Sequence, residues 1–230
     1  MNYQWIETRT GSPIVELRHY TLHPGRRDEL IGLFEQELVE PQEAAGARVL
    51  GSFRVEGAGQ SFLWLRGFPD MRTRKAALEG FYGGPVWRAH RDAANATMVD
   101  SDDVHLLRAI APAEGLPLSA LRHPPLGSEW PAQRYGLLVS ELRYPEFVGT
   151  YHLWLRLLLR KAGLSPLASF ATLPAENNFP LLPVWQNRPV HVVLMAGTSA
   201  LPDLPPELHA MLRTAPHLLA LAPTARSLLR

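Results

Sequence analysis

The hydrophobic and polar positions of the first half of the chain follow two periods in turn. Residues 14–20 alternate as a half-buried strand does, and residues 26–43 place Leu30, Phe34 and Leu38 on one face of a helix. A hairpin with glycines in its turn, two helical stretches separated by glycines, and a last strand follow. The resulting order, β-α-β-β-α-β, is that of the ferredoxin-like split βαβ motif.

A segment rich in proline and glycine divides the chain. Residues 111–131 show no sustained period, so we place a linker there, between a first unit at 1–110 and a second at 132–230. The second unit repeats the first weakly but in the same order, which indicates internal duplication. The paired blocks are 15–18 with 140–143, 51–53 with 168–170, 61–71 with 189–197, 69–70 with 202–203, and 104–108 with 225–230.

Two ferredoxin-like sheets, each with helices on one face, leave two open faces to bury. We therefore predict an α+β fold in which two tandem ferredoxin-like repeats pack sheet to sheet as an intramolecular α+β barrel. In such a barrel both sheets line a central cavity. One chain would then form the barrel that two identical chains form in a homodimer.

Composition narrows the classes of function. The 230 residues include 23 Lys and Arg and 22 Asp and Glu, and the two signs are interleaved along the chain. We therefore expect no nucleic-acid partner, because such proteins concentrate basic residues on one face. The absence of cysteine excludes disulfides, thiolate catalysis and cysteine-bound metal clusters.

Signals for export or membrane insertion are missing from the sequence. The N-terminus lacks a basic start followed by an apolar run, and the longest apolar stretch, residues 153–164, is interrupted by Arg156 and Arg160. We therefore expect a cytoplasmic protein with no signal peptide and no membrane partner. Self-association into a homo-oligomer stays open.

Three motifs carry a resemblance to a known family. The segments "VELRHYTLHPGRRDELIGLFE", "GSFRVEGAGQSFLWLRGF" and "GPVWRAH" resemble the NIPSNAP family of the dimeric α+β barrel superfamily, over Ile14 to Arg108. The resemblance implies the fold and leaves the function open, because the superfamily includes cofactor-free monooxygenases, haem enzymes, isomerases and binding proteins. Relatives carry an acid before the helix tryptophan, where this chain has "YGGPVW" at 82–87.

Strand alternation selects candidate residues for a site. If Val15 and Leu17 face the helices, then Glu16, Arg18 and Tyr20 face the barrel cavity. Charged residues on a covered face need partners. Glu16 and Arg18 therefore either pair with each other as a structural salt bridge or serve the cavity.

Other candidates lie on the remaining strands. Alternation places Arg54, Trp64 and Arg66 around the same space as Arg18, where arginines with an aromatic wall suit an anionic or polar-headed ligand. His105 and His191 are candidate acids or bases near neutral pH. Each of these side chains has a structural alternative, as a strand-end residue in water or a buried histidine. We expect the site mainly in the first unit.

We predict a protein that binds, and transforms by proton transfer or cofactor-free oxygenation, a small and partly apolar molecule, without a metal or a tightly bound cofactor. The expected catalytic residues are Glu16, His105 and His191, and the expected ligand-binding residues are Arg18, Tyr20, Arg54, Trp64 and Arg66. Two alternatives stay open. One is a non-catalytic binding or interaction scaffold, favoured by a packed interior with Glu16 paired to Arg18. The other is a haem enzyme with His152 as axial ligand.

Overall fold

The computed structural model describes residues 12–116, 121–197 and 200–230. The start of the chain, on which the signal-peptide expectation rests, and positions 117–120 of the predicted linker lie outside the described residues. Among the described residues, no helix has the length and apolar character needed to cross a bilayer.

The first half contains four strands and the helices between them. Its elements are β1 (Ile14–Leu22), α1 (Arg27–Leu33), the π-helical turn η1 (Phe34–Leu38), α2 (Val39–Ala44), β2 (Arg48–Val55), β3 (Ser61–Phe68), α3 (Met71–Tyr82), α4 (Pro85–Asn95) and β4 (Met98–Ala109). The first predicted helix is thus present, with a π-helical turn just before Pro41, which cannot donate a helix hydrogen bond. The glycine break predicted after Tyr82 separates α3 from α4.

The second half repeats this order of strands and helices. Its elements are η2 (Pro112–Glu114), β5 (Tyr135–Glu141), η3 (Pro145–Phe147), α5 (Val148–Lys161), β6 (Pro166–Thr172), β7 (Val190–Ala196), α6 (Pro206–Met211) and β8 (His217–Pro223). The described residues of the second half therefore contain four strands, whose bounds differ from the predicted ones.

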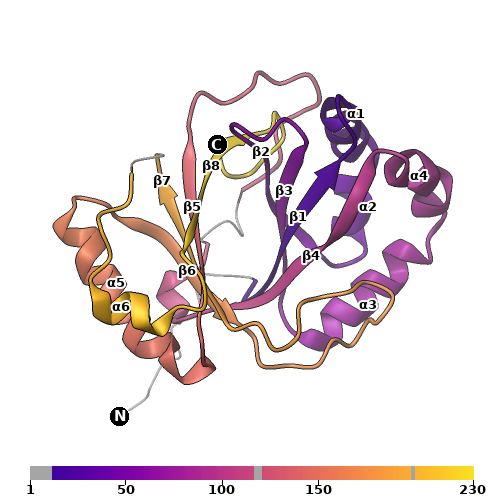
Figure 1. The fold of residues 1–230 in the computed structure, drawn as a ribbon. Helices are drawn as coiled ribbons and strands as arrows, with labels where there is room; N and C mark the ends of the chain where they lie inside the picture. The colour runs from indigo at the N-terminus through magenta and orange to yellow at the C-terminus, as the bar shows by residue number, and fades with distance from the viewer. Residues whose placement is uncertain (1–11, 117–120, 198–199) are drawn as a thin grey trace, which may run out of the picture.

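The eight strands of the described residues form one closed antiparallel barrel, in the order β1-β3-β2-β8-β5-β7-β6-β4. The two halves meet at two seams, where β2 pairs with β8 and β4 pairs with β6. The helices lie outside the barrel, with α1 to α4 on one side and α5 and α6 on the other (Figure 1). The prediction of a mixed α+β barrel is confirmed.

Apolar side chains from both halves fill the barrel. Phe53 of β2 and Phe170 of β6 belong to one buried cluster with Val15, Leu17 and Leu221. An eight-stranded barrel is just wide enough for its own side chains, so such a cluster leaves a packed interior. This cluster occupies the place where the central cavity was expected.

The predicted facing of β1 is also wrong. Val15 and Leu17 point into the barrel, whereas Glu16, Arg18 and Tyr20 lie on the opposite side, under the helices. Both faces of β1 are buried, so alternation separates the two sets of side chains without telling which set points inward. The charged set belongs to the layer between sheet and helices.

The predicted last strand is displaced by several residues. Residues 225–230 do not form it; β8 spans His217–Pro223, and Leu228 and Leu229 join the cluster inside the barrel. The paired Glu-Leu-Arg blocks are not equivalent either. Glu16 lies near the start of β1, and Glu141 is the last residue of β5.

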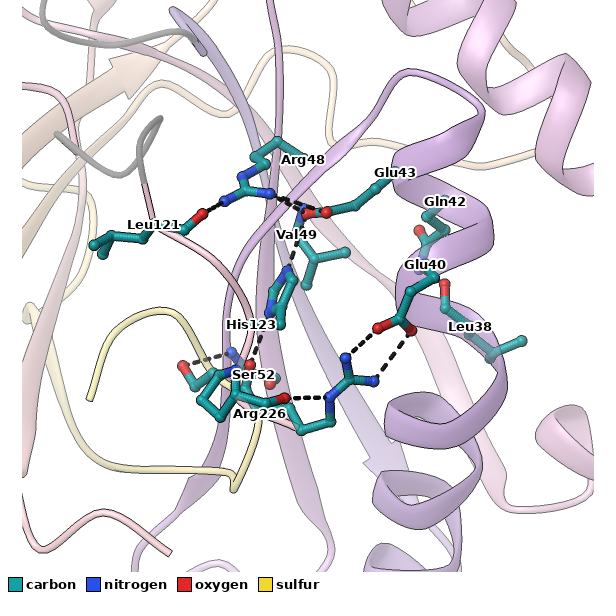
Figure 2. Close-up of polar contacts among 12 residues, drawn as sticks. Leu38, Glu40, Gln42, Glu43, Arg48, Val49, Ser52, Leu121, His123 and Arg226 are labelled. Carbon is teal, nitrogen blue, oxygen red and sulfur yellow. Dashed lines mark hydrogen bonds and ion pairs between the residues drawn. The ribbon is translucent and has the colours of Figure 1, made fainter. Parts of the chain in front are cut away.

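Polar contacts hold the C-terminal segment and part of the predicted linker against helix α2 (Figure 2). The guanidinium of Arg226 contacts the carboxylate of Glu40 and donates from Nε to the carbonyl of Pro124, 2.9 Å away. The ring of His123 lies between the carbonyl of Arg226 at 2.8 Å and the carboxylate of Glu43 at 2.9 Å. These contacts bind the end of the second half to the first.

Candidate functional site

A fully buried carboxylate with three arginines lies between β1, β3 and α3. The pairing of β1 with β3 puts Glu16 opposite Arg66, and alternation puts Arg18 on the same face. Glu16 accepts from Arg18 Nη1 at 2.9 Å, Arg66 Nε at 2.8 Å and Arg74 Nε at 2.6 Å. The four side chains are at most 2 % exposed. The salt bridge predicted between Glu16 and Arg18 is therefore present.

One carboxylate does not balance three guanidinium groups. The other polar side chains bonded to this cluster, those of Tyr20, Gln42, Tyr82, Asn177 and Asn178, are uncharged. Burial alone would raise the pKa of Glu16, but attraction by the arginines outweighs it and lowers the pKa to about 2. The cluster thus keeps an excess of two positive charges, three arginines less one carboxylate, where an unbalanced charge is expensive.

The low pKa of Glu16 predicts a dependence of stability on pH. A pKa of about 2 in the folded state, below the ordinary 4.5, means that ionised Glu16 stabilises the fold above pH 4.5. This stabilisation, about 3 kcal/mol, is lost as the pH falls towards 2. In urea unfolding, the stability gap between the native protein and Glu16→Gln should narrow by this amount on acidification. A gap independent of pH would contradict the assigned charge state.

Tyr20 and Trp64 contact the charged cluster and also line a cavity. Arg18 Nε donates to the Tyr20 hydroxyl at 2.9 Å, so the Tyr20 proton remains available to another acceptor. Burial raises the pKa of Tyr20 despite the charge of Arg18, which keeps the phenol protonated. The indole of Trp64 lies under the guanidinium groups of Arg18 and Arg66, at 5.6 and 5.2 Å from its ring centre.

The cavity itself lies between the sheet and the helices of the first half. Its volume is about 30 Å³, and Tyr20, Gln42, Trp64 and Tyr82 form its polar wall. The Nε1–H group of Trp64 is buried and has no partner among the described residues. A buried donor without a partner marks a place where a ligand or water atom would gain a hydrogen bond. We call this space the sheet–helix cavity.

A segment of the second half completes this region. The chain between β6 and β7 extends over α3 (Figure 1). Arg74 Nη1 donates to the side-chain oxygens of Asn177 at 3.1 Å and Asn178 at 2.7 Å. Phe179 stacks on Tyr82, with ring centres 5.9 Å apart. The first half therefore depends on the second for two partners of its charged cluster.

The other predicted residues lie elsewhere. Arg54 pairs with Asp28 at 3.0 Å and lies over Trp130, half-exposed and away from Glu16. His105 pairs in register with Leu17, on the barrel side of β4, and burial lowers its pKa although Asp103 lies 3.7 Å away. The structure therefore brings together Glu16, Arg18, Tyr20, Trp64 and Arg66, and leaves out Arg54, His105 and His191.

His191 belongs to a separate buried chain of contacts in the second half. Its Nε2 lies 3.0 Å from Nδ1 of His152, whose Nε2 lies 3.1 Å from the Glu114 carboxylate. Burial, with the charge of His152, lowers the pKa of His191 to about 3, so the ring is neutral near pH 7. Nδ1 of His152 thus faces His191 and its Nε2 faces the carboxylate of Glu114, an arrangement that does not favour the axial role given to it in the haem alternative.

Sequence reasoning missed Arg74, Gln42 and the two asparagines. A signal for Arg74 is present in the sequence, because the residue falls at helical spacing with Ala77, Leu78 and Phe81 on the buried face of α3. An arginine within an apolar stripe needs a buried acid, and Glu16 is that acid. Asn177 and Asn178 have no such local signal, because only the tertiary fold brings them to α3.

Comparisons with known proteins agree with this architecture. A proposed monooxygenase from Fusobacterium nucleatum superposes with a TM-score of 0.54 at 9% identity, covering 92% of each chain. A proposed monooxygenase from Lactobacillus acidophilus gives 0.52 at 11% identity, covering 92% of this chain and 94% of its own. At these identities the likeness concerns the fold alone. The fold thus defines the chain as an α+β barrel of the kind found in these proteins.

The first half of the chain matches a known protein family by its sequence. A model of the NIPSNAP family matches residues 15–112. A NIPSNAP-like domain protein from Burkholderia xenovorans is 26% identical over 52% of this chain and 95% of its own, with a TM-score of 0.38. No curated protein matches the chain. The family-model match over residues 15–112 agrees with the resemblance to the NIPSNAP family that the motifs of the first half predicted.

Proposed function

We propose that the chain is a pair of tandem ferredoxin-like repeats that binds a small, partly apolar molecule through an anionic or phenolic oxygen. The proposed site is the sheet–helix cavity of the first half. The observation that carries the proposal is the buried positive charge beside an unpartnered donor, Trp64 Nε1–H. An oxyanion there would accept from Trp64 and Tyr20 and would offset the charge of the three arginines.

The rest of the cavity suits the body of such a molecule. Phe34, Phe62 and Phe81 line it, and Phe34 meets both Phe62 and Trp64 edge to face, with ring centres 5.4 and 4.9 Å apart. Aromatic walls with a few convergent polar groups are typical of small-molecule sites. An aromatic acid or phenol has this combination of an apolar body and a polar head.

Helix α4 is the wall that must move to admit a ligand. The volume of about 30 Å³ holds no more than a water molecule, so the described conformation is a closed one. Ala94 is the single fully buried residue of α4, whereas the sheet wall is buried throughout. Few buried contacts mean a low cost of local opening. Gly83 and Gly84 join α4 to α3 and provide the hinge.

Binding accounts for the site better than proton transfer. The described residues that line the cavity include no histidine and no carboxylate. Glu16, the acid of the adjoining charged cluster, is held ionised by three arginines and has a pKa of about 2, which makes it a weak base. The sequence had linked a packed barrel with Glu16 paired to Arg18 to a non-catalytic protein, and the geometry supports that alternative.

The exchange Trp64→Phe tests this proposal. Phenylalanine keeps an aromatic wall and removes the unpartnered N–H group, so the fold should be retained while a hydrogen bond to the ligand is lost. Against salicylate, 4-hydroxybenzoate and 1-hydroxy-2-naphthoate, we expect at least one to raise the melting temperature of the native protein. Its dissociation constant, measured by calorimetry, should rise about 5- to 10-fold in Trp64→Phe.

The matched control is Trp154→Phe, because Trp154 lies on the exposed face of α5 in the other half. This variant should bind as the native protein does. Equal affinities of the native protein and Trp64→Phe would overturn the placement of the ligand head. A panel without any stabilising compound would count against the proposed ligand class.

A second candidate function is an interaction scaffold, and helix α5 favours it. Leu153, Trp154 and Leu157 are each more than half exposed on one outer face of this helix. Contiguous exposed apolar side chains of this size are typical of surfaces that contact other proteins. This surface is separate from the sheet–helix cavity, so the two functions do not exclude each other.

A further inference from the structure

A second cavity, lined by other residues than the sheet–helix cavity, lies at the seam where β4 pairs with β6. It is an open cleft of about 570 Å³ outside the barrel. The end of β4, the residues on either side of η3 and both ends of the segment between β6 and β7 form its walls. Its volume is in the range that metabolite-sized ligands occupy. We call it the seam cleft.

Four arginines from different parts of the chain converge on the seam cleft: Arg108, Arg143, Arg188 and Arg213. Arg188 and Arg213 contact the carboxylate of Glu141, at 2.8 and 3.4 Å. Arg108 and Arg143 make no ion pair with any residue that the structure describes, and both are exposed.

The acids of the cleft do not balance these arginines. Glu176 is the one acid among the described lining residues, and Glu141 and Asp103 contact residues that line the cleft. Four arginines less these three acids leave an excess of one positive charge. Guanidinium groups on several elements, aimed at one space, match the planar geometry of carboxylate and phosphate oxygens.

The wall that carries Arg188 is positioned before any ligand arrives. The backbone N–H of Trp185 donates to the carbonyl of Val104 at 2.8 Å, and its indole N–H donates to the carboxylate of Asp103 at 2.8 Å. The guanidinium of Arg188 lies 4.2 Å from the centre of the Trp185 ring. Groups that are already ordered lose little conformational entropy on binding.

The turn between these two side chains has a special backbone. Asn187 is the one non-glycine residue with positive φ, 60°, among those described. Asparagine tolerates this left-handed conformation better than most residues. A turn in an uncommon conformation, with its flanking side chains held by a neighbouring strand, is typical of a functional loop.

We propose that the seam cleft binds a small organic oxyanion, a molecule that carries a carboxylate or a phosphate group. Arg108 and Arg143 supply the charge that no described side chain neutralises. The apolar part of the molecule lies against Val148, Leu173 and Pro174, which also line the cleft. None of the residues of this site lines the sheet–helix cavity, so this inference does not rest on the proposed function.

Citrate and pyrophosphate are the probes that test the inference. Each is titrated into the full chain by calorimetry at constant ionic strength, with the fluorescence of Trp185 as a second readout. We expect saturable binding of at least one probe and a fluorescence change that is absent in Trp185→Phe. Binding of citrate alone assigns a carboxylate ligand, and binding of pyrophosphate alone assigns a phosphate ligand.

Two double variants with the same change of net charge distinguish specific binding at the seam cleft from nonspecific electrostatic attraction of the anionic probe. Arg108→Ala with Arg143→Ala should weaken binding at least tenfold. Arg72→Ala with Arg122→Ala removes two exposed arginines that make no ion pair with described residues and line no part of the seam cleft, and should leave the affinity unchanged. Equal affinities in the two double variants, or no saturable binding of either probe, would overturn the proposal.

Discussion

Replacing Glu16 with glutamine is expected to lower the free energy of unfolding by about 3–5 kcal/mol near pH 7. Glutamine has nearly the same volume, so the loss comes from charge rather than from packing. Arg18, Arg66 and Arg74, all at most 2 % exposed, would remain buried without the carboxylate that they share. Urea unfolding followed by far-ultraviolet circular dichroism measures this difference.

Glu79→Gln is the matched control for this prediction. Glu79 is exposed on α3 and lies 3.8 Å from Lys75, one helical turn away. Such surface pairs contribute about 0.3–0.5 kcal/mol, so the control should stay near the native stability. A loss in Glu16→Gln as small as that in the control would show that the arginines are neutralised or solvated in another way.

The order of elements could be predicted from the sequence because local periodicity encodes it. The glycines between α3 and α4 and the hairpin turn at Gly57 are local signals, and both breaks lie where these signals predict them. The facing of β1 could not be predicted in the same way. Helices cover one face and the opposite sheet covers the other, so both sets of side chains are buried.

Some of the repeated sequence blocks occupy equivalent positions in the two halves of the structure, and others do not. Glu16 and Glu141 share a motif but lie on opposite faces of the barrel wall. The motif lies near the start of β1, whereas in the second half β5 already ends at Glu141. Glu141 follows the alternation of Val139, which packs against the barrel interior. The match of three residues in sequence therefore gave the wrong register for this strand.

Only part of the charged cluster could be predicted from the sequence, and the limit has a physical reason. Alternation along β1 and β3 suffices to bring Glu16, Arg18 and Arg66 to one face, because the antiparallel pairing of neighbouring strands is local in effect. Arg74 comes from a helix and Asn178 from the other half of the chain. Contacts of that range depend on how helices cross the sheet, which no period in the sequence specifies.

A second large effect is expected in the barrel interior. Phe53 is fully buried among side chains of both halves, and its ring lies over Gly51, where an added Cβ would come within 2.8 Å of it. Phe170 occupies the corresponding block of the second half and belongs to the same cluster. These two blocks match in structure as well as in sequence. In each block a small residue two positions before the phenylalanine, Gly51 or Ala168, leaves room for the ring.

Phe53→Ala should therefore cost about 3–5 kcal/mol of unfolding free energy, the usual price of a large cavity in a rigid core. Leu181→Ala, at a site that is 83 % exposed, removes a similar apolar side chain and should change stability by less than about 0.5 kcal/mol. Guanidinium unfolding of both variants gives the comparison. A loss below about 1 kcal/mol in Phe53→Ala would mean that the interior has free space, as the predicted central cavity required. The expected large loss instead assigns the barrel interior to stability and leaves binding to the cavities outside it.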